Sequence, residues 1–156
     1  MRKYDKNKYE LYDFGLFDSN CVKTLFFPTI DLGGKKSAQA GTASLSKSWA
    51  KSDGKSIQIE LVTFDSLVSG GKIKLEAPKH QVGLLWLDVE GFALEAIRGM
   101  VEVMKKISVA KIEVEYQAEK DQWNKQNIFK VISLMYKMGF LPTRGYIHSL
   151  SRGDLV

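Results

Sequence analysis

The junction between an apolar run and an amphipathic segment, at residues 84–107, constrains the fold of this chain more than any other feature. Residues 84–87 read LLWL, and a run that is apolar at every position is typical of a central parallel strand with helices on both faces. Residues 88–91 read DVEG, and residues 92–107 then carry apolar side chains at helical spacing. The pattern predicts a buried strand that turns directly into a helix.

The rest of the C-terminal half repeats this order. Residues 109–116 (VAKIEVEY) predict a second strand, and residues 121–138 predict a second helix with one apolar stripe. Gly139 stands where a left-handed residue commonly ends a helix, and a further strand is expected after it. The order strand, helix, strand, helix, strand predicts an α/β sheet with right-handed crossovers.

The N-terminal half is expected to add three strands. Residues 8–17 are rich in aromatic and apolar side chains and predict one, and residues 22–27 predict another that ends at Pro28. Residues 56–62 (SIQIELV) alternate between apolar and polar positions. That alternation indicates a half-exposed strand, either at an edge of its sheet or in antiparallel pairing.

Two polar segments complete this half. Residues 31–55 consist largely of Gly, Ser, Ala and Lys, which predicts a flexible loop insertion that is either functional or disordered. Residues 63–71 predict a short helical turn, capped by Thr63 or Asp65 and ended by two glycines.

Composition favours some classes of protein over others. The net charge of +5 is too small to indicate a nucleic-acid partner by itself, and a solvated surface explains the lysines. The N-terminus lacks the apolar region of a secretory signal, and no run approaches the roughly 20 apolar residues that span a membrane. Cys21 is the only cysteine, so no internal disulfide forms. We expect a cytoplasmic protein with no membrane partner.

Asp88 and Glu90 have two competing interpretations. In open α/β sheets, ligands bind outside the carboxyl ends of the strands, which is where these two carboxylates lie. Either carboxylate then serves as a base, a metal ligand or a partner for a substrate hydroxyl. In the structural alternative, one of them caps the following helix, a contribution of about 0.5–2 kcal/mol.

The next strand carries further charge. Lys111, Glu113 and Glu115 alternate, so they share one face of the strand. Because burying lone charges is costly, the two glutamates either lie near the mouth of the sheet beside Asp88 or pair with lysines. The two histidines have no metal-ligand spacing around them, and no metalloprotease, hydrolase or P-loop motif is present, so no metal site is expected.

Taken in order, these motifs resemble the FkbM-type methyltransferases, a family of enzymes that depend on S-adenosylmethionine. The family's apolar strand followed by D-x-E-G is similar to residues 87–95 (LDVEGFALE), and its L-x-G to IRG at 97–99. Its T-x-D-x-L turn resembles TFDSL at 63–67, and its strand ending in Glu resembles IEVE at 112–115. GTASL at 41–45 is similar to a Ser-containing part of the family's inserted region.

The resemblance implies a fold and a reaction. The fold is a partial Rossmann-like methyltransferase sheet in the α/β class, mostly parallel, with an antiparallel strand near the C-terminus and an inserted hairpin or loop. The reaction transfers a methyl group from S-adenosylmethionine to an oxygen nucleophile of a small molecule or sugar. Asp88, Glu90 and Glu115 are the candidate catalytic residues, because the reaction requires positioning and a base for the hydroxyl proton.

One part of the family pattern is absent. No Gly-rich cofactor turn follows a strand upstream of Asp88, so no cofactor-binding residues are assigned and weak cofactor binding by this chain alone is expected. The resemblance covers the C-terminal two-thirds of such an enzyme, and residues 1–156 are expected to form a single, incomplete domain. An uncovered sheet edge then predicts a homo-oligomer or pairing with a missing N-terminal half.

Two other functions stay open. The chain is alternatively a non-catalytic α/β binding module derived from the same fold, which the missing cofactor turn favours. The second alternative is nucleic-acid binding through residues 31–55, which carry Trp49 and several lysines. That binding would depend strongly on salt.

Overall fold

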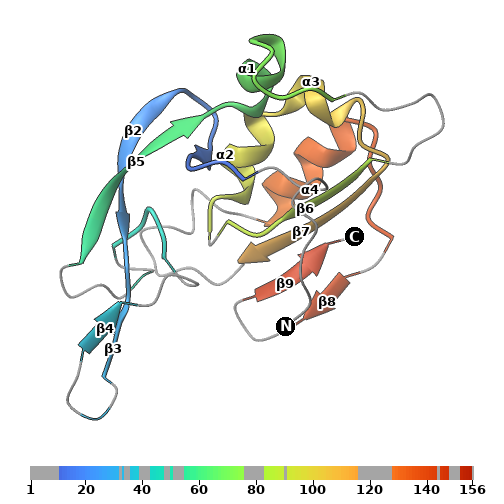
Figure 1. The fold of residues 1–156 in the computed structure, drawn as a ribbon. Coiled ribbons are helices and arrows are strands. Elements are labelled where there is room, and N and C mark those ends of the chain that lie inside the picture. The colour runs from blue at the N-terminus through green and yellow to red at the C-terminus, as the bar shows by residue number, and fades with distance from the viewer. Residues whose placement is uncertain are drawn as a thin grey trace, which may run out of the picture.

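The chain forms a mixed α/β structure whose strands lie in three sheets (Figure 1). The computed structural model describes residues 11–31, 33, 36–38, 43–47, 50, 55–75, 83–89, 91–115, 128–143, 145–147 and 152–155. The sheets, helices and clefts of the fold are those that these residues form.

The first sheet contains three strands in the order β1-β5-β2, with bounds β1 Gly15–Leu16, β2 Cys21–Phe26 and β5 Ser56–Val62. β2 runs antiparallel to β5 along its whole length, and β1 runs parallel to the end of β5. The strands predicted at 22–27 and 56–62 are confirmed. β5 is the central strand of this sheet rather than an edge, and its antiparallel pairing with β2 explains its alternation.

A hairpin lies at the far end of the ribbon that β2 and β5 form (Figure 1). β3 (Thr29–Asp31) pairs antiparallel with β4 (Lys36–Ala38), so the predicted inserted hairpin is present. Beyond it, Ser44 is buried and forms an isolated bridge with Phe26. The segment 31–55 is therefore not wholly a loop, and its flexibility stays a prediction.

The second main sheet contains four strands in the order β6-β7-β9-β8. Their bounds are β6 Leu84–Leu87, β7 Val109–Glu115, β8 Gly145–Ile147 and β9 Arg152–Leu155. β6 and β7 are parallel, as the strand–helix–strand pattern predicts, and β9 is antiparallel to both of its neighbours. The antiparallel strand near the C-terminus is confirmed. The expectation of a mostly parallel sheet is not met in the described residues, because only β1–β5 and β6–β7 pair in parallel there.

The prediction that β6 is a central strand covered on both faces is wrong for the described part of the chain. β6 is an edge strand there, and the exposed fractions of Leu84 and Trp86 are 66% and 68%. Leu87 is only 3% exposed, because it faces the helices that lie over one side of the sheet (Figure 1). An all-apolar run does not distinguish this one-sided burial from burial on both faces.

The core lies between that covered face and three helices, α2 (Ala93–Arg98), α3 (Val101–Met104) and α4 (Ile128–Lys137). The predicted apolar stripe of the 92–107 segment is buried. The fully enclosed side chains include Ile97, Met100, Met104 and Val131. Gly139 ends α4 at a φ of 90°, with the Phe140 N–H donating to the Met135 carbonyl, as the predicted left-handed cap requires.

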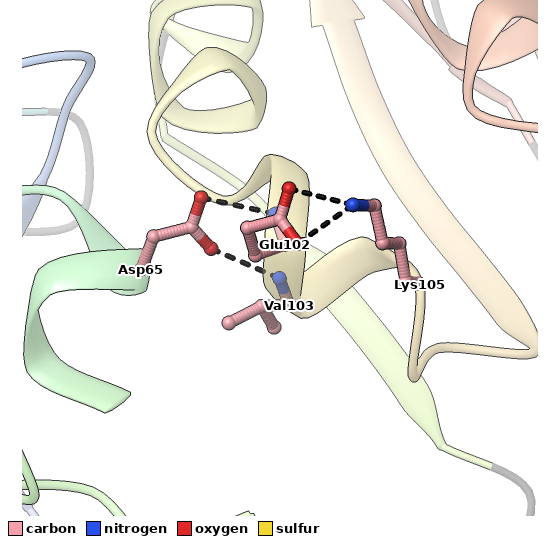
Figure 2. Close-up of polar contacts among 4 residues, drawn as sticks. All are labelled: Asp65, Glu102, Val103 and Lys105. Atoms are coloured by element: carbon pink, nitrogen blue, oxygen red, sulfur yellow. Dashed lines mark hydrogen bonds and ion pairs between the residues drawn. The ribbon is translucent and has the colours of Figure 1, made fainter. Parts of the chain in front are cut away.

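The single helix predicted over 92–107 is divided in two, and Asp65 is the physical reason. Asp65 lies on α1 (Phe64–Ser69), and its carboxylate accepts hydrogen bonds from the backbone N–H groups of Glu102 and Val103 at 3.0 and 2.9 Å (Figure 2). In a continuous helix, the Val103 N–H would donate to the carbonyl of Gly99. That carbonyl instead accepts from the Asp65 N–H at 3.0 Å. Asp65 thus caps α3 with its carboxylate, and its backbone N–H donates to the Gly99 carbonyl at the break.

Thr63, the other candidate cap in the turn, caps its own helix. Its hydroxyl accepts from the Ser66 N–H at 3.1 Å, and Gly70 and Gly71 follow the helix as predicted. Both candidates are therefore capping residues, but they cap different helices.

Gly99 lies in the break, in close contact with the chain that follows β1. A Cβ at this position would lie 1.8 Å from the backbone oxygen of Phe17, which no side chain tolerates without backbone movement. The glycine of the IRG motif thus lets the chain after β1 pack directly against the end of α2.

Candidate functional site

The carboxyl end of β6 opens onto a cleft of about 260 Å³, which we call the Asp88 cleft. Three regions of the chain meet there: the first sheet, the segment 43–45 and the turn after β6. The lining residues are Gly15, Leu16, Leu25, Ala43, Ser44, Leu45, Ile59, Leu61, Asp88, Val89 and Phe92. This place fits the expectation that α/β sheets bind ligands beyond the carboxyl ends of their strands.

Asp88 is the only ionisable side chain in the described lining of this cleft. It follows the buried Leu87 directly and is exposed, and no hydrogen bond or ion pair is recorded for its carboxylate among the described residues. The helix α2 begins after Phe92, with no side-chain cap. The capping interpretation therefore does not hold for Asp88, and its carboxylate is available to a ligand.

The backbone turn after Asp88 depends on Gly91. Gly91 is buried and has a φ of 92°, a region that side chains other than glycine rarely adopt. The Phe92 N–H then donates to the Val89 carbonyl at 3.2 Å, which closes the turn. The turn places the Phe92 side chain against the cleft next to Asp88.

The other two predicted catalytic residues are less fully described. Glu90 lies outside the described residues. Glu115 ends β7, which pairs in parallel with β6 in a register that joins Leu87 to Ile112. Asp88 directly follows β6, and Glu115 is the last residue of the neighbouring parallel strand β7. Whether the Glu115 side chain lies beside Asp88 or pairs with a lysine stays a prediction. A catalytic role for each of the three stays a prediction.

A second hollow, of about 450 Å³, shares Phe92 with the Asp88 cleft. Unlike the Asp88 cleft, this hollow is lined by both acidic and basic side chains. One of the basic side chains, Lys23, places its Nζ 4.0 Å from the centre of the Phe17 ring. Its lining residues are Phe17, Asp18, Ser19, Lys23, Phe92, Leu94, Glu95, Arg98 and Lys130.

Sequence reasoning missed Phe92 and the first sheet as parts of the site. The position of Phe92, directly after DVEG, was the available signal. Phe17, just after β1, contacts Phe92 and approaches Gly99 at the two ends of α2, and such contacts between distant segments have no counterpart in local sequence patterns.

The described ranges contain no candidate metal site and no candidate membrane span. No group of three or more His, Cys, Asp or Glu side chains there is arranged to hold a metal ion. None of the helices described there combines the length and apolar character needed to cross a membrane.

A comparison with models of known protein families shows the family to which this chain belongs. A family model described as "Methyltransferase FkbM domain" matches residues 7–142. The chain belongs to the FkbM methyltransferase family. No curated protein and no solved structure matches the chain.

The FkbM match spans both main elements of the site. It includes the first sheet and the DVEG turn, so the Asp88 cleft lies within the matched region. Asp65 and Gly99, the two residues at the break between α2 and α3, lie in the TFDSL and IRG segments that resemble the family's motifs.

Proposed function

We propose that this chain is a methyltransferase in which the Asp88 cleft binds the methyl acceptor. The reaction moves a methyl group from S-adenosylmethionine to an oxygen nucleophile of a small molecule or sugar, which forms an O–CH3 bond, breaks the S–CH3 bond and releases S-adenosylhomocysteine. The observation that carries the proposal is the position of Asp88, an exposed carboxylate at the rim of a cleft in an FkbM-family chain, with no hydrogen bond or ion pair to another described residue.

In this proposal, Asp88 positions the acceptor and removes its proton. The carboxylate accepts a hydrogen bond from the acceptor hydroxyl, which fixes the oxygen at the rim of the cleft. The proton passes to the carboxylate as the oxygen becomes a better nucleophile. A positioned base of this kind typically contributes about 10²–10⁴-fold to a rate.

The described lining of the Asp88 cleft does not fit the whole methyl donor. S-adenosylmethionine supplies an activated methyl group, but it also carries an amino-acid zwitterion and a ribose diol. The described lining of the Asp88 cleft offers one carboxylate and no cation for these groups. No donor-binding residue is therefore assigned, and Asp88 is assigned to the acceptor.

The test is a methyl-transfer assay on the whole chain. S-adenosylmethionine with a labelled methyl group is supplied at millimolar concentration with a panel of alcohols, phenols and sugars. Label is expected in at least one acceptor, and Asp88→Asn is expected to lower the rate about 100-fold. Asp18→Asn, an exposed aspartate outside the cleft, is the matched control. Transfer that is unchanged in Asp88→Asn, or no transfer to any acceptor, overturns the proposal.

A non-catalytic binding module is the second candidate. The poor fit of the cleft to the donor favours it, because a cleft can bind a hydroxyl compound without reacting with it. Binding of an acceptor without any transfer of label would support this candidate over the first.

A further inference from the structure

We propose that the Asp88 cleft selects an acceptor whose hydroxyl is attached to a small apolar body, such as an aryl alcohol, and that it excludes saccharides. This selectivity rests on the proposed function for its identification of the ligand as a methyl acceptor. It narrows the proposed acceptors, which included both small molecules and sugars, to small molecules.

Most of the side chains that line the cleft are apolar. Seven of the lining side chains are hydrocarbon groups larger than alanine: Leu16, Leu25, Leu45, Ile59, Leu61, Val89 and Phe92. These side chains come from separate parts of the chain, so the apolar character is a property of the assembled cleft rather than of one segment. Ligand pockets of this composition recognise apolar bodies and use a few polar groups for orientation.

The segment 43–45 forms one wall, and the structure anchors it. Ser44 and Phe26 exchange two backbone hydrogen bonds, of 2.8 and 3.0 Å. The Ser44 hydroxyl also accepts from the Ser46 N–H at 3.2 Å, and only 2% of the residue is exposed. Because the polar groups of Ser44 are engaged in holding the segment, this wall presents Ala43 and Leu45 to the cleft.

Aryl alcohols and saccharides differ in how many of their hydroxyls find a hydrogen-bond partner in the cleft. An aryl alcohol has one hydroxyl, and Asp88 accepts its hydrogen bond while the ring contacts the apolar walls. A saccharide carries several hydroxyls, and the polar side chains of the described walls are limited to Asp88 and to Ser44, whose hydroxyl already accepts from the Ser46 N–H. Each buried hydroxyl without a partner weakens binding by roughly tenfold. The cleft therefore favours one hydroxyl on an apolar body.

The size of the cleft agrees with a small ligand. Its volume of about 260 Å³ lies just below the roughly 300–1,000 Å³ range of small-molecule sites. A one- or two-ring alcohol suits this volume better than a larger conjugate.

The test uses three probes and protein-detected NMR, which reports binding without turnover. The probes are 2-naphthol, its methyl ether 2-methoxynaphthalene, and methyl glucoside. We expect 2-naphthol to shift the amide signals of Ala43, Ser44 and Ile59, the ether to bind about tenfold more weakly, and the glucoside to cause no shift. Asp88→Asn is expected to remove most of the difference between 2-naphthol and its ether.

A matched pair of variants tests the apolar wall. Ile59→Thr places a hydroxyl in the cleft and is expected to weaken 2-naphthol binding about tenfold. Ile57→Thr makes the same change two residues earlier on β5, outside the cleft, and is expected to leave the affinity unchanged.

The outcomes separate this inference from the proposed function. Glucoside binding at least as tight as that of 2-naphthol, or naphthol shifts confined to the exposed Leu84 and Trp86, overturns the selectivity. If 2-naphthol binds in the cleft as described and no methyl transfer follows, the selectivity stands and the proposed reaction fails. If a sugar is methylated in an Asp88-dependent reaction, the reaction stands and the selectivity fails.

Discussion

Replacement of Asp65 by alanine tests the structural logic of the T-x-D-x-L turn. The change removes both acceptors for the Glu102 and Val103 N–H groups without touching the Asp88 cleft. If the account of the divided helix is right, α3 loses its cap and the chain loses stability, but the cleft keeps its lining.

The expected magnitude follows from the two contacts. Loss of an N-cap side chain costs about 0.5–2 kcal/mol, and a hydrogen bond to a charged group contributes about 1.5–3 kcal/mol. The Glu102 contact is exposed, so water replaces much of it, whereas the Val103 contact is partly buried. We expect a loss of about 2 kcal/mol in the free energy of unfolding. Asp65→Asn keeps one acceptor oxygen and is expected to lose about half as much.

Urea unfolding followed by circular dichroism provides the measurement. With a typical slope of about 2 kcal/mol per molar urea, the midpoint of Asp65→Ala should fall by about 1 M. Asp13→Ala, which removes an exposed aspartate outside the turn, is the control and should shift the midpoint by less than about 0.25 M. Equal shifts for Asp65→Ala and Asp13→Ala would refute the capping argument.

Three other changes probe the rest of the account. Gly99→Ala should destabilise the chain by at least about 2 kcal/mol, because its Cβ would meet the Phe17 oxygen; a urea midpoint like that of the wild type would contradict this contact. Met100→Ala should cost about 2–5 kcal/mol in the same assay, since this core side chain is fully buried, and a loss below 1 kcal/mol would argue against the described core. We also propose that the exposed edge strand β6 supports homo-oligomers, so Trp86→Lys should lower the mass measured by light scattering; an unchanged mass would remove β6 from that interface.

Short-range patterns in the sequence predicted much of the local structure. The alternation of residues 56–62 located β5, and the helical stripe that includes Ile97 and Met104 identified the buried face. Gly139 marked the end of α4 because a left-handed cap has a specific sequence requirement. Each of these features is encoded within a few residues, so one sequence is enough to find it.

The misses have a common physical origin in contacts between distant segments. The break at Gly99 depends on an Asp65 carboxylate more than 30 residues away, and helical periodicity alone does not register it. The one-sided burial of β6 depends on which helices reach the sheet, which LLWL does not specify. Strand direction likewise depends on how the strands are connected. The strand–helix alternation predicts parallel pairs, so it did not indicate the antiparallel pairing of β2 with β5 or of β7 with β9.

The sequence likewise predicted only part of the candidate site. The DVEG turn located Asp88 at the end of a strand, and the turn geometry at Gly91 agrees with that placement. The opposite wall, from Ala43 to Leu45, lies in a segment whose composition indicated only a loop. Its place beside Asp88 arises from the bridge between Ser44 and Phe26, a pairing that no local motif announces.

The most direct test of the central claim is the rate of methyl transfer by the wild type and by Asp88→Asn, measured at saturating acceptor and millimolar S-adenosylmethionine. If the Asp88 carboxylate positions and deprotonates the acceptor, kcat falls about 100-fold in the variant, while Asp18→Asn keeps the wild-type rate. A kcat for Asp88→Asn equal to that of the wild type would contradict the claim that the Asp88 cleft is the acceptor site.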